Sequence, residues 1–206
     1  MIHRVEALAR ATLAHALVQS AIHFPSVLEA MGLDVPGALE RALVLAEEAI
    51  ARCPELADGH SALGRVLLCS DEPGALDAAR EALERALRRD PAHDPAEVCL
   101  ATLDRESGDH QRALERLDRV VHAGNGHPLT FVLRGIVYAE LGRTADARRD
   151  FSRVMTIAPE SGIVDLELAR ADVWSEEQLE AIRARAEARL GSRYGWAAST
   201  LASPSQ

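Results

Sequence analysis

The chain has 206 residues, of which 48% are hydrophobic but only 3% aromatic, and it carries a formal net charge of −9. This length is enough for one domain or one short repeat array. The acidic balance gives a phosphate backbone no general electrostatic attraction, so nucleic acid is excluded as an expected partner. Ala and Leu supply most of the apolar content, whereas β-branched and aromatic residues are sparse, so we expect an all-α chain.

The first predicted element is a helix over residues 3–21. It contains Glu6, Arg10 and His15, so it lacks the uncharged apolar core of a signal peptide. No apolar run in the chain has the length of a membrane span, and we expect no membrane partner. The segment HFPSVLEAMGLDVP, residues 23–36, then interrupts the helical pattern. We expect an inserted loop there, followed by a second helix over residues 37–53.

Four glycines, at positions 37, 74, 108 and 142, mark an internal repeat with spacings of 37, 34 and 34 residues. Small or apolar residues recur five, nine and twelve positions after each glycine: Ala42, Ala46 and Ala49; Ala79, Leu83 and Ala86; Ala113, Leu117 and Val120; Ala147, Phe151 and Val154. These offsets share one helical face, which predicts a buried stripe. The glycines suit tight turns between antiparallel helices, and a proline follows three of the four stripes at offset seventeen, where it would end the second helix.

This pattern resembles the tetratricopeptide repeat family. The order of residues in the family's signature is matched in one unit by Phe131, Gly135, Tyr138, Gly142, Ala147, Phe151 and Pro159. The resemblance is strongest there, extends over residues 57–127, and is weakest over residues 1–56. It implies a right-handed superhelical solenoid of about four antiparallel helix pairs with a C-terminal capping helix.

A capping helix is expected near the end of the chain. Ser175 and Gln178 have the spacing of a capping box. Leu179, Ile182, Ala186 and Leu190 then follow on one face, and Gly191 supplies a stop signal. We expect a single repeat domain over residues 1–192 and a loose tail over residues 193–206. Within that tail, Trp196 is expected to pack on the cap, with a docking role as the alternative.

Two residues depart from the family pattern. Arg134 stands where Leu is usual, and Asp104 stands where a large apolar residue is usual. One hypothesis is a partly buried ion pair between these two residues across adjacent units. The alternative is that both side chains reach solvent.

No catalytic motif is present, and we expect no enzyme, no cofactor and no metal site. The three cysteines form no CxxC pair, which is consistent with a reducing cytoplasm. His93, His110, His122 and His127 fall near predicted loops on one side of the array, with spacings that match no standard ligand pattern. We expect these histidines to be solvated, and we expect a soluble, cytoplasmic protein.

The resemblance places a groove on the first helices of the pairs. Its inferred lining residues are Ser61, Arg65, Leu68, Val98, Thr102, Arg105, Val132 and Ile136. A mixed lining of this kind suits a protein or peptide segment with some negative charge, which the two arginines would grip through paired hydrogen bonds. The alternative for both arginines is internal pairing with neighbouring acids. Alternatives for the protein as a whole are self-association into a homo-oligomer, and regulation of an enzyme encoded nearby.

Overall fold

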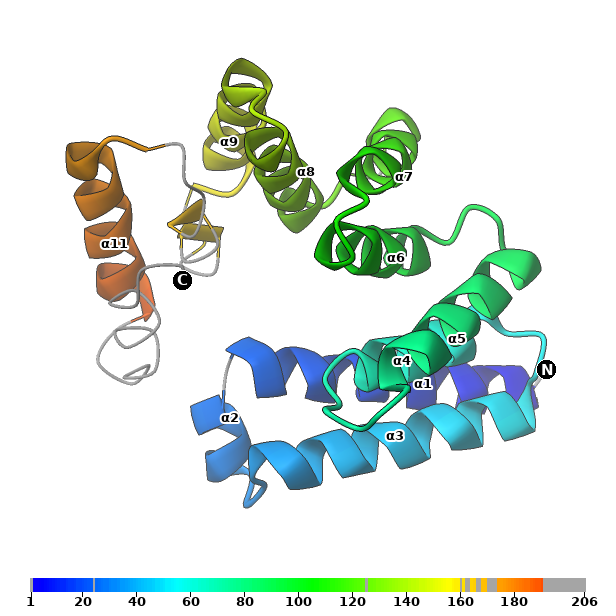
Figure 1. Ribbon diagram of the computed structural model, residues 1–206. Helices are drawn as coiled ribbons and strands as arrows, with labels where there is room; N and C mark the ends of the chain where they lie inside the picture. The colour runs from blue at the N-terminus through cyan, green and yellow to red at the C-terminus, as the bar shows by residue number, and fades with distance from the viewer. Residues whose placement is uncertain are drawn as a thin grey trace. The chain divides into compact units, whose positions relative to one another are not determined.

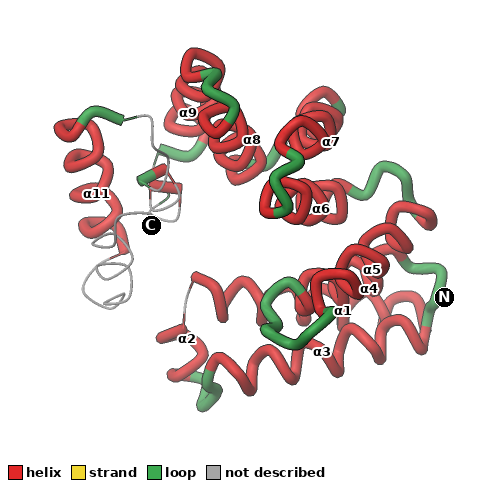
Figure 2. Tube along the Cα trace, in the orientation of Figure 1, coloured by secondary structure: helices red, strands yellow, loops and turns green. Residues whose placement is uncertain are grey.

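A computed structural model describes residues 2–23, 25–124, 126–159, 161, 164–165, 168–169 and 174–190. Within these ranges every regular element is a helix and none is a strand (Figure 2). The helices are α1 (Ile2–His23), α2 (Pro25–Ala30), α3 (Val35–Arg52), α4 (Ala57–Leu67), α5 (Ala75–Arg89), α6 (Asp94–Glu106), α7 (His110–His122), α8 (Pro128–Glu140), α9 (Thr144–Ile157) and α11 (Glu176–Leu190).

The chain divides into two compact units, residues 1–103 and residues 104–206, with the boundary inside α6. In the first unit α1 packs along α3, and α4 packs along α5 (Figure 1). In the second unit α8 packs along α9, and α7 contacts α8. In the pairs α1–α3, α4–α5 and α8–α9 the two helices therefore lie side by side. The expected single domain over residues 1–192 stays a prediction.

The predicted buried stripe is confirmed in all four second helices. All twelve residues at the three offsets are at most 2% exposed. They belong to α3, α5, α7 and α9. The small alanine at the first offset brings the helix axes close, because it leaves little side chain between them.

Three of the four predicted turn glycines have the expected backbone. Gly74, Gly108 and Gly142 have φ values of 82°, 83° and 71°, which is the left-handed region that glycine adopts most easily. Gly37 does not lie in a turn. It is the third residue of α3, and its N–H donates a hydrogen bond of 2.8 Å to the Oδ1 atom of Asp34, the N-cap. Between α2 and α3 the turn glycine is Gly32, with φ of 76°.

The expected loop after α1 contains a short helix, α2, which corrects the sequence interpretation. Pro25 is its first residue, a position where the missing N–H costs nothing. Leu28 is fully buried in the core of the first unit, together with side chains of α1, α3 and α4. Burial of Leu28 thus folds a segment that, from its sequence, interrupts the repeat.

Glycines inside the first helices let a large residue of the second helix reach the backbone. A Cβ atom on Gly64 would lie 2.5 Å from Cγ of Leu83, and one on Gly135 would collide with the ring of Phe151. The two positions are equivalent in their pairs, α4–α5 and α8–α9. The glycine inside the first helix therefore has a direct packing cause in these two pairs.

The capping box of α11 is confirmed. The Ser175 N–H donates to Oε1 of Gln178 at 3.1 Å, and the Gln178 N–H donates to Oγ of Ser175 at 3.3 Å. Ile182 is 3% exposed and packs in the core of the second unit, and Ala186 is fully buried. The side chain of Leu190, the stop at Gly191 and the tail over residues 193–206, with Trp196, lie outside the described residues.

One aromatic residue of this core is not anticipated by the repeat pattern. The ring of Trp174 lies 5.3 Å from that of Phe151, centroid to centroid. Its Nε1–H donates a hydrogen bond of 2.7 Å to the backbone carbonyl of Leu168. Trp174 thus extends the core of α8 and α9 toward α11.

Candidate protein-binding surface

The eight predicted lining residues are divided between the two units. Ser61, Arg65, Leu68, Val98 and Thr102 lie in the first, and Arg105, Val132 and Ile136 lie in the second. Leu68, Val98, Thr102 and Ile136 are half-buried.

Two of the eight residues offer no surface to a partner. Ser61 is 0% exposed and Val132 is 2% exposed, so neighbouring side chains cover both. Thr102 is accessible, but its hydroxyl donates to the carbonyl oxygen of Val98 at 3.2 Å. The surface that remains for a ligand is therefore smaller than the sequence suggests.

Arg105 is engaged within its own unit. Its Nη1 donates to Oε1 of Glu140 in α8 at 3.0 Å, and a longer contact of 3.9 Å joins Nη2 to Glu106. The same Glu140 lies 3.3 Å from Nδ1 of His110. Arg105 therefore follows the alternative given for it above, internal pairing with a neighbouring acid.

Arg65 in α4 differs from Arg105. Throughout the part of the chain that the structure describes, its guanidinium forms no ion pair and donates no hydrogen bond. The side chain is half-buried, and its charge acts on His15 of α1 and on Cys69 and Cys99. A half-buried arginine whose guanidinium has no acceptor among the described residues can still bond to an anionic group of a partner.

Three titratable groups on which the charge of Arg65 acts, His15, Cys69 and Cys99, are held in their uncharged forms. Burial, with the charges of Arg65 and His93, lowers the pKa of His15 to about 4, against a weaker opposing effect of Asp58. Burial raises the pKa of Cys69 and of Cys99, only partly offset by Arg65. Near neutral pH, His15, Cys69 and Cys99 are therefore uncharged and offer Arg65 no anionic partner.

The hypothesis that Asp104 pairs with Arg134 is wrong. Asp104, 1% exposed, accepts a hydrogen bond of 2.7 Å from Nε of Arg116 in α7. Arg134 instead donates two hydrogen bonds of 2.7 Å to Asp150 in α9 and one of 2.8 Å to Asp118 in α7. Neither side chain is solvated, because each finds its opposite charge on the next helix along the chain.

The charge on Arg134 is fixed by these partners. Burial by itself would lower the pKa of this guanidinium, but the hydrogen bonds and the charge of Asp150, with Asp118, raise it above its usual value. The rings of Phe131 and Tyr138 flank the guanidinium, each with its centroid 5.7 Å from Cζ. Arg134 is therefore a structural cation and is not available to a ligand.

The loop histidines are not all solvated, which corrects a second expectation. His93 is 7% exposed, and its Nδ1 accepts a hydrogen bond of 3.2 Å from the Ala96 N–H at the start of α6. His127, one repeat later, accepts from the Leu129 N–H at 3.3 Å as the N-cap of α8. Helix capping is thus a role of histidine in this chain.

Among the described residues, no three His, Cys, Asp or Glu side chains come together as a metal ion would require.

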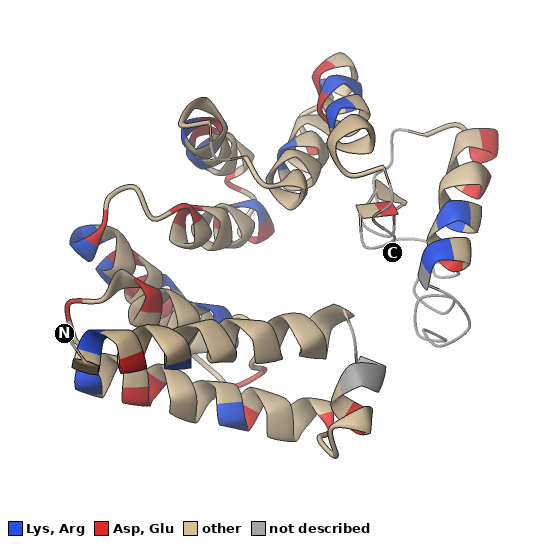
Figure 3. Cartoon of the chain, turned by 180° about the vertical axis from the view of Figure 1, so that it is seen from behind, with Lys and Arg blue, Asp and Glu red and all other residues tan. Residues whose placement is uncertain are grey.

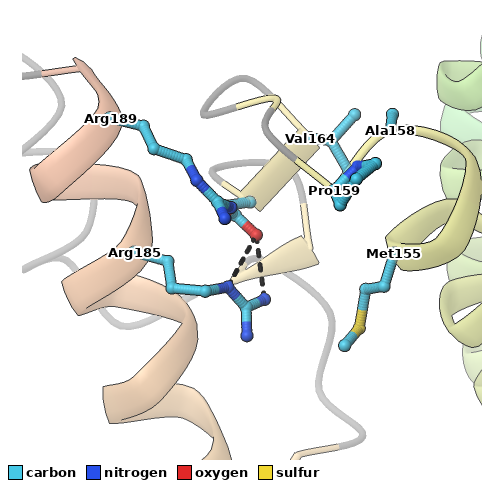
Figure 4. Close-up of a pocket in the computed structure, with 7 residues that line it drawn as sticks. Met155, Ala158, Pro159, Val164, Arg185 and Arg189 are labelled. Carbon is cyan, nitrogen blue, oxygen red and sulfur yellow. Dashed lines mark hydrogen bonds and ion pairs between the residues drawn. The ribbon is translucent and has the colours of Figure 1, made fainter.

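A small pocket of about 200 Å³ lies in the second unit between the end of α9 and α11. Arg185 and Arg189 project into it from one face of α11, opposite Met155, Ala158 and Val164 (Figure 4). Both arginines bond to the carboxylate of Asp165, which is 3% exposed. Because their hydrogen bonds already fasten α11 to the segment before it, we assign this cluster a structural role.

The comparisons with known proteins agree with the repeat. The family described as tetratricopeptide repeat has a sequence model that matches residues 71–129. A search of curated proteins finds no match. No helix in the described ranges is both long and apolar enough to cross a membrane.

Solved structures are similar to this chain in fold. TTC0263, a thermophilic TPR protein in Thermus thermophilus, has a TM-score of 0.67 at 20% identity, over 89% of this chain and 98% of that one. Pseudomonas aeruginosa pilF has a TM-score of 0.59 at 20% identity, over 93% and 82%. YrrB, described as a TPR protein with an unusual peptide-binding site, has a TM-score of 0.51 at 19% identity, over 87% and 89%. The expected all-α fold of antiparallel helix pairs and the resemblance to the repeat family are confirmed.

Proposed function

We propose that this tetratricopeptide repeat protein is a non-catalytic, cytoplasmic adaptor that binds a segment of another protein, with Arg65 gripping a carboxylate of that segment. The family match and the similar folds support protein binding as the general activity. The description of YrrB as having a peptide-binding site supports a peptide as the ligand. A fold alone is a weak warrant for function, so the proposal depends on the surface around Arg65.

The observation that carries the proposal is the contrast between two arginines. Arg105 already has Glu140 as its partner at 3.0 Å, whereas Arg65 forms no ion pair with any described residue. A guanidinium binds a carboxylate through two parallel hydrogen bonds, which fix the register of a ligand and add binding energy. The guanidinium of Arg65 can therefore bond to a carboxylate of a ligand, whereas the guanidinium of Arg105 is already bonded to Glu140.

Apolar contact is available next to Arg65. Leu68, the C-cap of α4, is half-buried against the core formed by α4, α5 and α6, and Val98 is half-buried on α6. A segment with one acidic residue flanked by apolar side chains matches this surface. The acid would bond to Arg65, and its apolar neighbours would cover Leu68 and Val98.

The proposal is tested by affinity capture from the native cell. The full chain and its Arg65→Ala and Arg105→Ala variants serve as baits, and mass spectrometry identifies what each retains. We expect the parent and Arg105→Ala to retain a common protein that Arg65→Ala loses. Retention of that protein by all three baits, with unchanged helical spectra, would place the binding surface elsewhere on the chain.

A further inference from the structure

Helix α1 has a second apolar seam that packs against nothing else among the described residues of the first unit. Its positions alternate in steps of three and four, the spacing of a coiled-coil seam, and all five are exposed: Ile2, Val5, Ala9, Thr12 and Ala16. The opposite face of α1 is buried against α3 and α4, with Ala7, Ala11, Ala14 and Val18 fully covered. A helix that is apolar on both sides is typical of one covered on both sides.

Large aliphatic residues give this seam its area. Ile2 is 72% exposed, Val5 64%, and the flanking Leu8 and Leu13 are 43% and 45% exposed. Together the four side chains expose roughly 400 Å² of apolar surface, which is as much as the largest patch of an ordinary monomer. Two copies that cover these residues, with Ala9, Thr12 and Ala16 between them, would bury about 1,000 Å² in all, at the lower end of specific interfaces.

The charges of α1 select a second copy of the chain as the occupant. The seam has no formally charged side chain, and the charged residues of α1 are confined to Arg4, Glu6 and Arg10 (Figure 3). Glu6 and Arg10 are already paired at 2.8 Å with Arg52 and Glu48 of α3. Because the chain carries a net charge of −9, two copies repel over most of their surface, and this uncharged seam is a place where they meet without that repulsion.

We propose that the protein forms a symmetric dimer in which α1 of one copy packs antiparallel along α1 of the other. An antiparallel arrangement separates the two positive helix N-termini and the two Arg4 side chains, which a parallel one would bring together. It also sets large residues against small ones. In the register that aligns Val5 with Ala16 of the partner, Ala9 lies opposite Thr12, and these small residues allow close approach of the two axes.

Sedimentation equilibrium over about 1–200 µM protein tests the dimer, a range suited to a small interface of micromolar affinity. We expect the mass of the parent chain to rise from 22.3 kDa toward twice that value. Val5→Glu should weaken dimerisation at least ten-fold, because it places two buried carboxylates in the seam. Leu76→Glu is the matched control, since Leu76 is 50% exposed but lies on α5, and it should dimerise as the parent does.

The double variant Val5→Glu/Ala16→Arg tests the antiparallel register. Each new glutamate should then face the partner's new arginine, and the dimer should return to within a few-fold of the parent. A parent chain that stays at 22.3 kDa throughout, or a Val5→Glu variant that dimerises as the parent does, overturns the proposal. Arg65→Ala should leave the dimer intact, so a failure of the dimer is distinguishable from a failure of the Arg65 site.

Discussion

Buried charges in the second unit are matched in pairs between successive helices. Asp104 of α6 bonds to Arg116 of α7, and Arg134 of α8 bonds to Asp150 of α9. Arg116 and Asp150 occupy the same position of the repeat, eight residues after the turn glycine. The second helix therefore carries the cation in one repeat and the anion in the next. A buried pair of this kind costs much desolvation, and loss of one member leaves the other uncompensated.

Arg116→Leu should therefore destabilise the protein by about 3–5 kcal/mol, because the carboxylate of Asp104 would stay buried with its main partner gone. Adding Asp104→Leu should recover most of that loss, since an apolar residue is usual at this position of the repeat. Urea unfolding of the parent, the single variant and the double variant measures both effects. A double variant no more stable than Arg116→Leu would contradict this account of the pair.

His15 makes stability depend on pH. Its pKa is about 4 in the folded chain and near 6.5 when exposed, chiefly because of burial, with Arg65 and His93 adding to the effect. Between these values the unfolded chain binds more protons, so stability present above pH 6.5 is lost as the pH falls toward 4.

We expect the parent to lose up to about 2 kcal/mol more than His15→Gln between pH 7 and pH 5, with His15 as the only group that differs. Unfolding by urea at each pH measures the difference. Parallel pH profiles for the two proteins would show that His15 titrates normally in the folded chain.

At the scale of residues, the sequence predicts which positions are buried but not which partners meet. Asp104 and Arg134 were recognisable as departures from the repeat, yet their partners lie 12 or 16 residues away on other helices and depend on which helix packs alongside. The capping of α6 and α8 by His93 and His127 was equally hidden, because histidine is an uncommon N-cap. Its recurrence at an interval of 34 residues was the signal that could have revealed it.

At the scale of elements, the pairs α4–α5 and α8–α9 each depend on a glycine opposite a large residue. Gly135 allows the ring of Phe151 to lie against the backbone of α8, and Phe151 is fully buried. Phe151→Ala should therefore cost about 3–5 kcal/mol through the cavity that it leaves.

The converse change tests the packing more directly. Gly135→Ala should destabilise by roughly 1–3 kcal/mol, because its new Cβ collides with the Phe151 ring. Phe151→Leu, which removes the ring edge, should relieve that collision. The loss measured by thermal unfolding for the double variant should then be smaller than the sum of the two single losses. Strict additivity would mean that the two residues are not in contact.

The repeat pattern made most helices predictable. The first repeat is irregular, and its helices were predicted less well. A period of 34 residues and a stripe at fixed offsets located α4 to α9, because each second helix must bury the same face. In the first repeat, the N-cap Asp34 and Pro36 start α3 before Gly37, the residue that aligns with the turn glycines. The short α2 and the packing of Trp174 depend on contacts with distant segments, which no local pattern encodes.

At the scale of the whole molecule, the chain offers two kinds of surface. One is the group around Arg65, where a cation stands without an internal partner among the described residues, beside half-buried apolar side chains. The other is the uncharged seam of α1. The first suits an acidic segment of a different protein, and the second suits an identical copy, so the two functions do not compete for the same residues.

The most direct test of the adaptor function is a double-mutant cycle between Arg65 and the ligand. The captured partner is shortened to the smallest peptide that still binds. A set of variants of that peptide is then made, each with one acidic residue changed to its amide. Titration calorimetry measures the affinity of the parent chain and of Arg65→Ala for each peptide. We predict that Arg65→Ala weakens binding by about 1–3 kcal/mol and that this loss disappears with one particular amide peptide. An Arg65→Ala chain that binds every peptide as tightly as the parent would contradict the account.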